Sequence, residues 1–151
     1  MAFAVLTEAH IPLLAELYVE TYNAPPWNDA WTTPLATKRL DEMICCRDAY
    51  GLACLDDHGA IVGMVVGSSE TYYNCTQFFI KDFFIIPAIQ GQGFGTALLA
   101  ELELRLRHMG IEKTYLFTAK GGQTERYYHH HGYTSWNGMV LMGKRLGKPG
   151  A

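Results

Sequence analysis

The sequence predicts one α/β (α+β) domain built on a mixed, mostly antiparallel sheet of about seven strands, with helices on both faces and one parallel strand pair. Two observations lead to this fold class. Apolar segments with strand character occur in pairs around short polar turns, which is typical of antiparallel hairpins. A single crossover, from a strand through a glycine loop and a helix to another strand, lies within residues 77–118, and the right-handed connection rule makes its two strands parallel. The 151 residues, 49% of them hydrophobic, suit one compact core.

The elements are expected in the order β, α, α, β, β, β, α, β, α, β, β. Strands are predicted where apolar residues alternate or cluster: 1–6, 50–55, 60–68, 77–86, 113–118 and a hairpin over 133–146. Helices are predicted where apolar residues recur every three to four positions: from Thr7 to Tyr22, from Thr33 to about Cys46, from near Thr96 to Met109, and from Gln123 to His131. The last hairpin is expected to turn at Asn137-Gly138. These elements form a single domain over residues 1–147, with 148–151 as a C-terminal tail.

Composition narrows the class of function. The formal net charge is −3 and no basic block occurs, so neither nucleic acid nor an anionic membrane is an expected partner. Residues 1–6 lack the basic start of a signal peptide, and no apolar stretch reaches the roughly 18 residues of a spanning helix, so we expect a cytoplasmic protein. The four cysteines form no CxxC pair and are expected to be free thiols.

The most informative segment is Gln90-Gly91-Gln92-Gly93-Phe94-Gly95, which connects an apolar strand to an amphipathic helix. A glycine loop at a helix N-terminus presents backbone N–H groups and a positive dipole end to one point, where a pyrophosphate binds well. The dinucleotide pattern GxGxxG fails because Thr96 stands where it requires glycine. A second match, GxxxxGK from Gly138 to Lys144, lacks the Ser or Thr that would hold magnesium.

The chain resembles the GCN5-related N-acetyltransferases (GNAT), in particular small bacterial members that are similar to aminoglycoside 6′-N-acetyltransferases. The resemblance rests on the glycine loop, on the strand that ends at Phe84-Ile85-Ile86-Pro87, and on the later segment Tyr128-His129-His130-His131-Gly132-Tyr133. It implies acetyl-CoA as cofactor and a parallel strand pair that splays at the loop. The cofactor-binding residues that it implies are Phe84, Ile85, Ile86, Gln90, Gly91, Gln92, Gly93, Phe94, Gly95, Thr96, Gln123 and Tyr128.

The resemblance also implies roles for two catalytic residues. Tyr128 matches the tyrosine that lies beside the CoA sulfur and protonates the leaving thiolate; the alternatives are an ordinary core aromatic, or Tyr127 in that role. Asp82 matches an acidic position of members that acetylate small cationic amines, and is a candidate base or amine anchor; the alternative is an inert salt bridge to Lys81 or another cation. A backbone amide near Ile85 would polarise the thioester carbonyl.

In the segments that line the acceptor site in this fold, the sequence has four aromatic residues that would face a cation: Trp27, Trp31, Tyr72 and Tyr73. The alternative is that these rings pack the first helix onto the sheet. Metal binding by His129-His130-His131 is not expected, because consecutive helical residues point about 100° apart. Where many family members have an asparagine that holds the cofactor, this chain has Gly121, so contacts there must come from backbone, Gln123 or Thr124.

The resulting hypothesis is an acetyl-CoA-dependent N-acetyltransferase that acts on a primary amine of a small cationic molecule, polyamine-like or aminoglycoside-like. The ammonium form of such an amine, with a pKa near ~10.4, must lose a proton before it can attack. Two alternatives stay open: a non-catalytic acyl-CoA-binding module, and a protein N-acetyltransferase. A homodimer is possible because homodimers are common in the family.

Overall fold

The computed structural model describes residues 1–149, which fall into two compact units, 1–116 and 117 onward, each described here by itself. The first unit contains one five-stranded sheet in the order β1 to β5. Its strands are β1 (Ala2–Val5), β2 (Ala49–Leu55), β3 (Ile61–Thr71), β4 (Thr76–Ile85) and β5 (Lys113–Tyr115). Neighbouring strands pair antiparallel except β4 and β5, which pair parallel. The predicted mixed, mostly antiparallel sheet with one parallel pair is confirmed.

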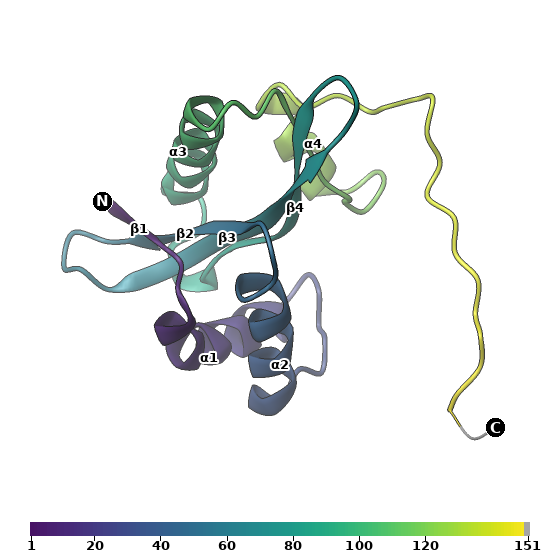
Figure 1. Ribbon diagram of the computed structural model, residues 1–151. Coiled ribbons are helices and arrows are strands. Elements are labelled where there is room, and N and C mark those ends of the chain that lie inside the picture. Colours follow the sequence, from purple (N-terminus) through teal and green to yellow (C-terminus); the bar gives the residue numbers. More distant parts are fainter. Residues whose placement is uncertain (150–151) are drawn as a thin grey trace. The chain divides into compact units, whose positions relative to one another are not determined.

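Three helices of the first unit cover the two faces of this sheet (Figure 1). The helices α1 (Ile11–Tyr22) and α2 (Thr33–Ile44) lie side by side on one face, and α3 (Phe94–His108) lies on the other. Leu14, Leu40 and Met43 are fully buried under α1 and α2 and pack in one cluster with Met64 and Phe84 of the sheet. Burial of such side chains contributes roughly 1.5–3 kcal/mol each, so this core holds α1 and β4 in a defined arrangement.

A β-bulge interrupts the pairing of β3 with β4. Val66 pairs with Asp82, and the next residue, Gly67, pairs with Ile80, so Lys81 is the extra residue of β4. A bulge shifts the alternation of side chains along a strand. Phe84 accordingly belongs to the core under α1 and α2, whereas Ile80 is buried outside that cluster.

The parallel pairing of β4 with β5 is short. It covers only Gln77–Phe79 against Lys113–Tyr115, although β4 continues to Ile85. The backbone of β4 beyond Phe79 is therefore outside this ladder, and such an edge can pair with an added extended chain.

The second unit contains α4 (Gln123–His130). The hairpin predicted over 133–146 is wrong: none of residues 117–149 is in a strand, and the sheet has five strands instead of about seven. A turn does form at the predicted place, where the Met139 N–H donates to the Trp136 carbonyl at 3.1 Å. No ladder follows it, and an isolated two-stranded hairpin is only marginally stable in water.

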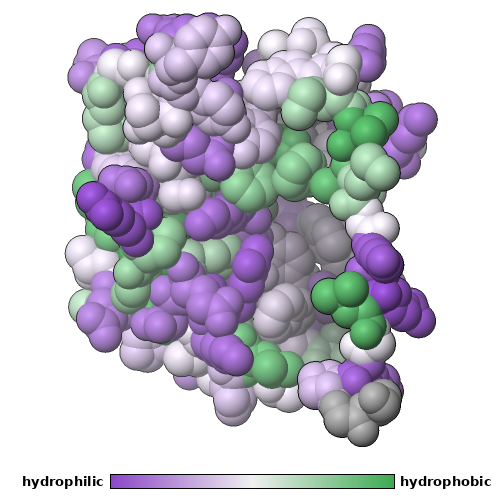
Figure 2. Space-filling view, turned by 45° about the vertical axis from the view of Figure 1, so that its right-hand side comes forward, coloured by the Kyte–Doolittle hydropathy of each residue, from purple (hydrophilic) through white to green (hydrophobic). Residues whose placement is uncertain are grey.

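Apolar side chains after that turn are exposed, and Figure 2 shows hydrophobic residues interspersed with hydrophilic ones on the molecular surface. Met139 to Met142 are 70–83% exposed. Within residues 1–149 no helix has both the length and the apolar character that crossing a membrane requires.

Candidate active site

The glycine loop follows β4 and leads into α3. After the short 3-10 turn Pro87–Ile89, Gly91 and Gly93 have φ angles of 80° and 91°. This left-handed region costs other residues about 1–2 kcal/mol, which explains glycine at both positions. A Cβ built on either glycine would have no atom within 4 Å, so the space in front of the loop is open.

Gly93 is the N-cap of α3, which begins at Phe94, two residues earlier than predicted. Phe94, Gly95 and Thr96 form its first turn, where backbone N–H groups point outward along the helix axis. Open space above two left-handed glycines, next to the positive end of a fifteen-residue helix, fits a pyrophosphate. Gln92 lies exposed in the same loop.

The end of β4 is tied to this loop by a side chain. The Gln90 amide donates to the Ile85 carbonyl at 2.8 Å, and the Ile86 N–H donates to the Val62 carbonyl at 2.9 Å. The Ile86 amide is thus used within the sheet. Phe84 is 4% exposed and its ring contacts α1, so only its backbone can face a ligand.

Asp82 lies on β4 just beyond the bulge and accepts three hydrogen bonds. Its Oδ2 accepts from the Tyr18 hydroxyl at 2.7 Å. Its Oδ1 accepts from the Tyr22 hydroxyl and from the Phe83 N–H, the latter at 3.1 Å. Burial raises the pKa of Asp82, and the hydrogen bonds from both tyrosines and the nearby Arg39 guanidinium oppose that rise. Burial and the adjacent carboxylate in turn raise the pKa of Tyr18.

Lys81 does not form the salt bridge to Asp82 that the sequence left open. Its ammonium instead donates to the Cys46 sulfur at 3.6 Å. The bulge separates the two neighbours, since Lys81 is the residue without a partner on β3. Asp82 therefore faces tyrosines of α1 rather than a lysine.

The rings of the predicted acceptor residues Trp27 and Trp31 contact the two tyrosines that bind Asp82. The Trp31 ring meets Tyr18 edge-on at 5.0 Å, and the Trp27 ring meets Tyr22 edge-on at 5.3 Å. Trp31 is held by backbone bonds to the Asn23 side chain at 2.8 and 2.9 Å, and Trp27 is 41% exposed. The rings of Tyr18, Tyr22, Trp27, Trp31 and Phe84 are called the aromatic cluster below.

Tyr72 and Tyr73 lie in the turn between β3 and β4. They are 50% and 98% exposed, so they project into solvent instead of packing on the sheet. Near this end of the sheet, the Tyr115 hydroxyl donates to Glu70 at 2.5 Å, and the Tyr115 ring stacks on Phe79 at 4.9 Å.

Gln123 and Tyr128 lie in the second unit. Gln123 is the first residue of α4. Tyr128 is 8% exposed, and its ring contacts Tyr127 at 5.4 Å and Tyr133 at 5.5 Å. Gly121 has a φ of 77° and its N–H donates to Glu125, so the position where the resemblance implies an asparagine is a glycine turn here.

Sequence reasoning missed Tyr18, Tyr22 and Arg39 as partners of Asp82. Both tyrosines share one face of α1, because both donate to Asp82. Their spacing of four residues places two hydroxyls one helical turn apart, but it does not indicate which residue they face.

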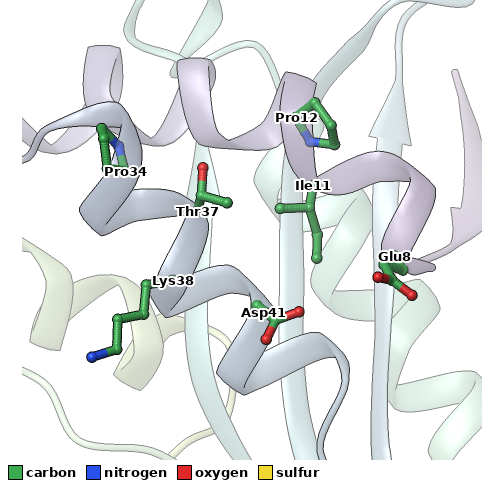
Figure 3. A pocket seen from close by; sticks show the side chains of 7 residues that line it. All are labelled: Glu8, Ile11, Pro12, Pro34, Thr37, Lys38 and Asp41. Carbon is green, nitrogen blue, oxygen red and sulfur yellow. The ribbon is translucent and has the colours of Figure 1, made fainter.

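A shallow hollow on the outside of α1 and α2 is separate from these residues (Figure 3). It is lined by Ile11 and Pro12 from α1 and by Thr37 and Asp41 from α2, among others. None of the predicted site residues lines it.

Comparison with known proteins agrees with this geometry. The family model described as the acetyltransferase (GNAT) family matches residues 12–133. The chain matches no curated protein sequence.

Three similar solved structures share the fold at low identity. The crystal structure of a probable acetyltransferase is 14% identical, with a TM-score of 0.82, over 98% of this chain and 99% of that one. An aminoglycoside acetyltransferase from an uncultured soil metagenomic sample, in complex with sisomicin, is 16% identical, with a TM-score of 0.72 and coverage of 97% and 96%. The ribosomal-protein-alanine N-acetyltransferase of Brucella melitensis biovar Abortus 2308 is 14% identical, with a TM-score of 0.75 and coverage of 96% and 100%. With a family match over most of its length, this chain belongs to the acetyltransferase (GNAT) family.

Proposed function

We propose that this acetyltransferase transfers an acetyl group from acetyl-CoA directly to a primary amine of a small cationic molecule, of the polyamine or aminoglycoside type. The observation that carries the proposal is Asp82, a carboxylate set among aromatic rings on the strand that leads to the glycine loop. A carboxylate and ring faces both attract an ammonium group. The similar fold of a protein that was crystallised with the aminoglycoside sisomicin supports a small-molecule acceptor.

On the donor side, the loop from Gln90 to Gly95 and Thr96 would hold the pyrophosphate through backbone N–H groups. The backbone at Phe84, Ile85 and Ile86 would pair with the pantetheine arm, because β4 extends to Ile85, beyond its ladder with β5. At Ile86 the carbonyl would make that contact, since the N–H is bonded to Val62. The family resemblance also implies cofactor contacts from Gln123 and Tyr128, which lie in the second unit. The lone pair of the amine attacks the thioester carbonyl carbon of acetyl-CoA.

On the acceptor side, the amine must lose a proton, since an alkyl ammonium with a pKa near ~10.4 is almost wholly protonated at neutral pH. Asp82 serves as base or as anchor for the ammonium, with Trp27 and Trp31 as the wall on its side. Tyr72 and Tyr73, exposed in the β3–β4 turn, would contact a part of the acceptor farther from the reacting amine. Tyr128 protonates the departing sulfur.

We also propose a cytoplasmic location and a homodimer. Measurement of the molecular mass by light scattering tests the dimer.

The test is a turnover screen with the purified protein. Thiol release from acetyl-CoA is followed with 1,4-diaminobutane, spermidine, sisomicin and a peptide that has a free N-terminus. Turnover with the small amines supports the proposal, while turnover with the peptide alone points to protein N-acetylation. Binding of coenzyme A in calorimetry, without acetylation of any of these amines, would show a non-catalytic binding module.

Tyr128 has its own test within that screen. Tyr128→Phe keeps the ring and removes the hydroxyl, so we expect a drop in kcat of about 100-fold, the usual size of a general-acid contribution. Tyr127→Phe is the matched control and should leave kcat within a few-fold. Equal kinetics for wild type and Tyr128→Phe would remove this residue from the mechanism.

A further inference from the structure

We propose that Tyr22 is the residue that takes the proton from the acceptor amine, and that Asp82 acts through Tyr22 as the final proton acceptor. This inference rests on the proposed function and specifies how its acceptor side works. It changes the role of Asp82 from a base that touches the amine to a positioning residue for the phenol.

The first argument is that both oxygens of Asp82 are already engaged. Oδ2 accepts from Tyr18, and Oδ1 accepts from Tyr22 and from the Phe83 N–H. An ammonium that approached the carboxylate directly would compete with these donors at a part-buried group, and displacing a tyrosine hydroxyl would leave a donor without its partner, which is costly. The carboxylate is thus better placed to receive a proton along an existing hydrogen bond than from the amine itself.

The second argument is the difference in exposure between the two tyrosines. Tyr18 is 3% exposed and is enclosed by the rings of Trp31, Tyr22 and Phe84. Tyr22, at the last position of α1, is only partly buried, and its ring contacts Trp27, which is 41% exposed, as well as the buried Phe84. A molecule that arrives from solvent therefore reaches Tyr22 before Tyr18.

The proton transfer balances as follows. A proton of the ammonium moves to the Tyr22 oxygen while the Tyr22 proton moves to Asp82 Oδ1, so the amine nitrogen regains its lone pair and Tyr22 stays neutral. The nitrogen then forms a bond to the acyl carbon. The carbon–sulfur bond breaks, and the sulfur leaves with the two electrons of that bond. The nitrogen releases a second proton, and a general acid delivers one proton to the sulfur. Asp82 returns its proton to solvent by the reverse path. The products are the amide, the thiol and one released proton.

The surroundings of Asp82 suit this role. The groups that face it are the hydroxyls of Tyr18 and Tyr22 from α1 and the guanidinium of Arg39 from α2. Burial raises the pKa of Asp82, with these three groups opposing the rise. A carboxyl group whose protonated form is favoured by burial is a better proton acceptor than an exposed aspartate.

The experiment compares two variants that each remove one hydroxyl from the same carboxylate. Tyr22→Phe and Tyr18→Phe keep their rings and so the ring contacts of the aromatic cluster. With the amine that the wild type turns over fastest among 1,4-diaminobutane, spermidine and sisomicin, we expect Tyr22→Phe to lower kcat/KM by about 100-fold. Tyr18→Phe should lower it by about fivefold, the cost of one lost hydrogen bond. Coenzyme A affinity in calorimetry should be the same in both, which shows that both are folded.

A pH profile separates proton transfer from a structural role. In the wild type kcat/KM should fall on the acid side as Asp82 becomes protonated. In Asp82→Asn this inflection should be absent, and kcat/KM should follow only the fraction of neutral amine in solution. Equal losses in Tyr22→Phe and Tyr18→Phe, or the same acid-side inflection in wild type and Asp82→Asn, would overturn the inference while leaving the acetyltransferase proposal intact. A wild type that binds coenzyme A and turns over none of the amines would overturn the proposed function and this inference with it.

Discussion

Gly67 is the position where a single methyl group should do most damage to the first unit. It lies on β3 opposite the bulge of β4, paired with Ile80. A Cβ at Gly67 would stand 2.0 Å from the Phe79 carbonyl oxygen and 2.7 Å from Cε1 of Phe78, whereas ordinary contacts begin at 3.4 Å. The obstacle is backbone rather than the end of a flexible side chain, so β4 itself must move in Gly67→Ala.

The expected cost follows from that geometry. Overpacking a well-packed interior usually costs about 1–3 kcal/mol, and a clash with a sheet carbonyl should cost near the upper value, about 3 kcal/mol. The shift would also reach the site, because Phe79 is the last residue of β4 that pairs with β5 and the bulge that follows it orients Asp82. We therefore expect lower turnover together with lower stability.

The assay is urea unfolding followed by tryptophan fluorescence, with the free energy of unfolding taken from linear extrapolation. Gly63→Ala should destabilise the protein less than Gly67→Ala does, and Gly51→Ala less than Gly63→Ala. The closest backbone oxygens lie 2.4 Å from the built Cβ of Gly63 and 2.6 Å from that of Gly51. Gly143→Ala, where no atom lies within 4 Å, is the control and should stay within about 0.5 kcal/mol of wild type. A Gly67→Ala protein as stable as this control would refute the reasoning.

Two further outcomes are expected. Gln90→Ala removes the 2.8 Å bond to the Ile85 carbonyl, so coenzyme A affinity in calorimetry should fall by about fivefold, which corresponds to one hydrogen bond; unchanged affinity would show that this bond does not shape the loop. The pKa of Asp82 is raised in the folded protein, so the folded state binds the Asp82 proton more tightly than the unfolded chain does. The stability that this difference provides is present at low pH and is lost as pH rises through the folded pKa. The free energy of unfolding of Asp82→Asn relative to wild type should therefore increase from pH 4 to pH 7, and a constant difference would contradict the pKa direction.

Much of the fold follows from local signals. The glycine loop between a strand and an amphipathic helix, and the apolar runs on either side of Gly59, are readable because turn chemistry and side-chain periodicity act over a few residues. These signals predicted the β2–β3 hairpin and the parallel β4–β5 pair, both of which are confirmed. They also carried the resemblance that the family match confirms.

The same local signals failed for residues 133–146. The Asn137-Gly138 turn forms, but a strand also needs a partner for its backbone, and no strand among residues 117–149 supplies one. Turn chemistry is a property of two residues, whereas a ladder depends on what lies beside it.

The sequence by itself determined the order of the elements from the first strand to the last helix, the glycine loop and the presence of an acidic residue on the strand before it. Only the tertiary structure decided what that residue touches. The bulge at Lys81 and the packing of α1 on β4 place Tyr18 and Tyr22 around Asp82, which lies 64 and 60 residues farther along the chain. Such a contact depends on where two elements pack, and the spacing of residues within either element does not encode it.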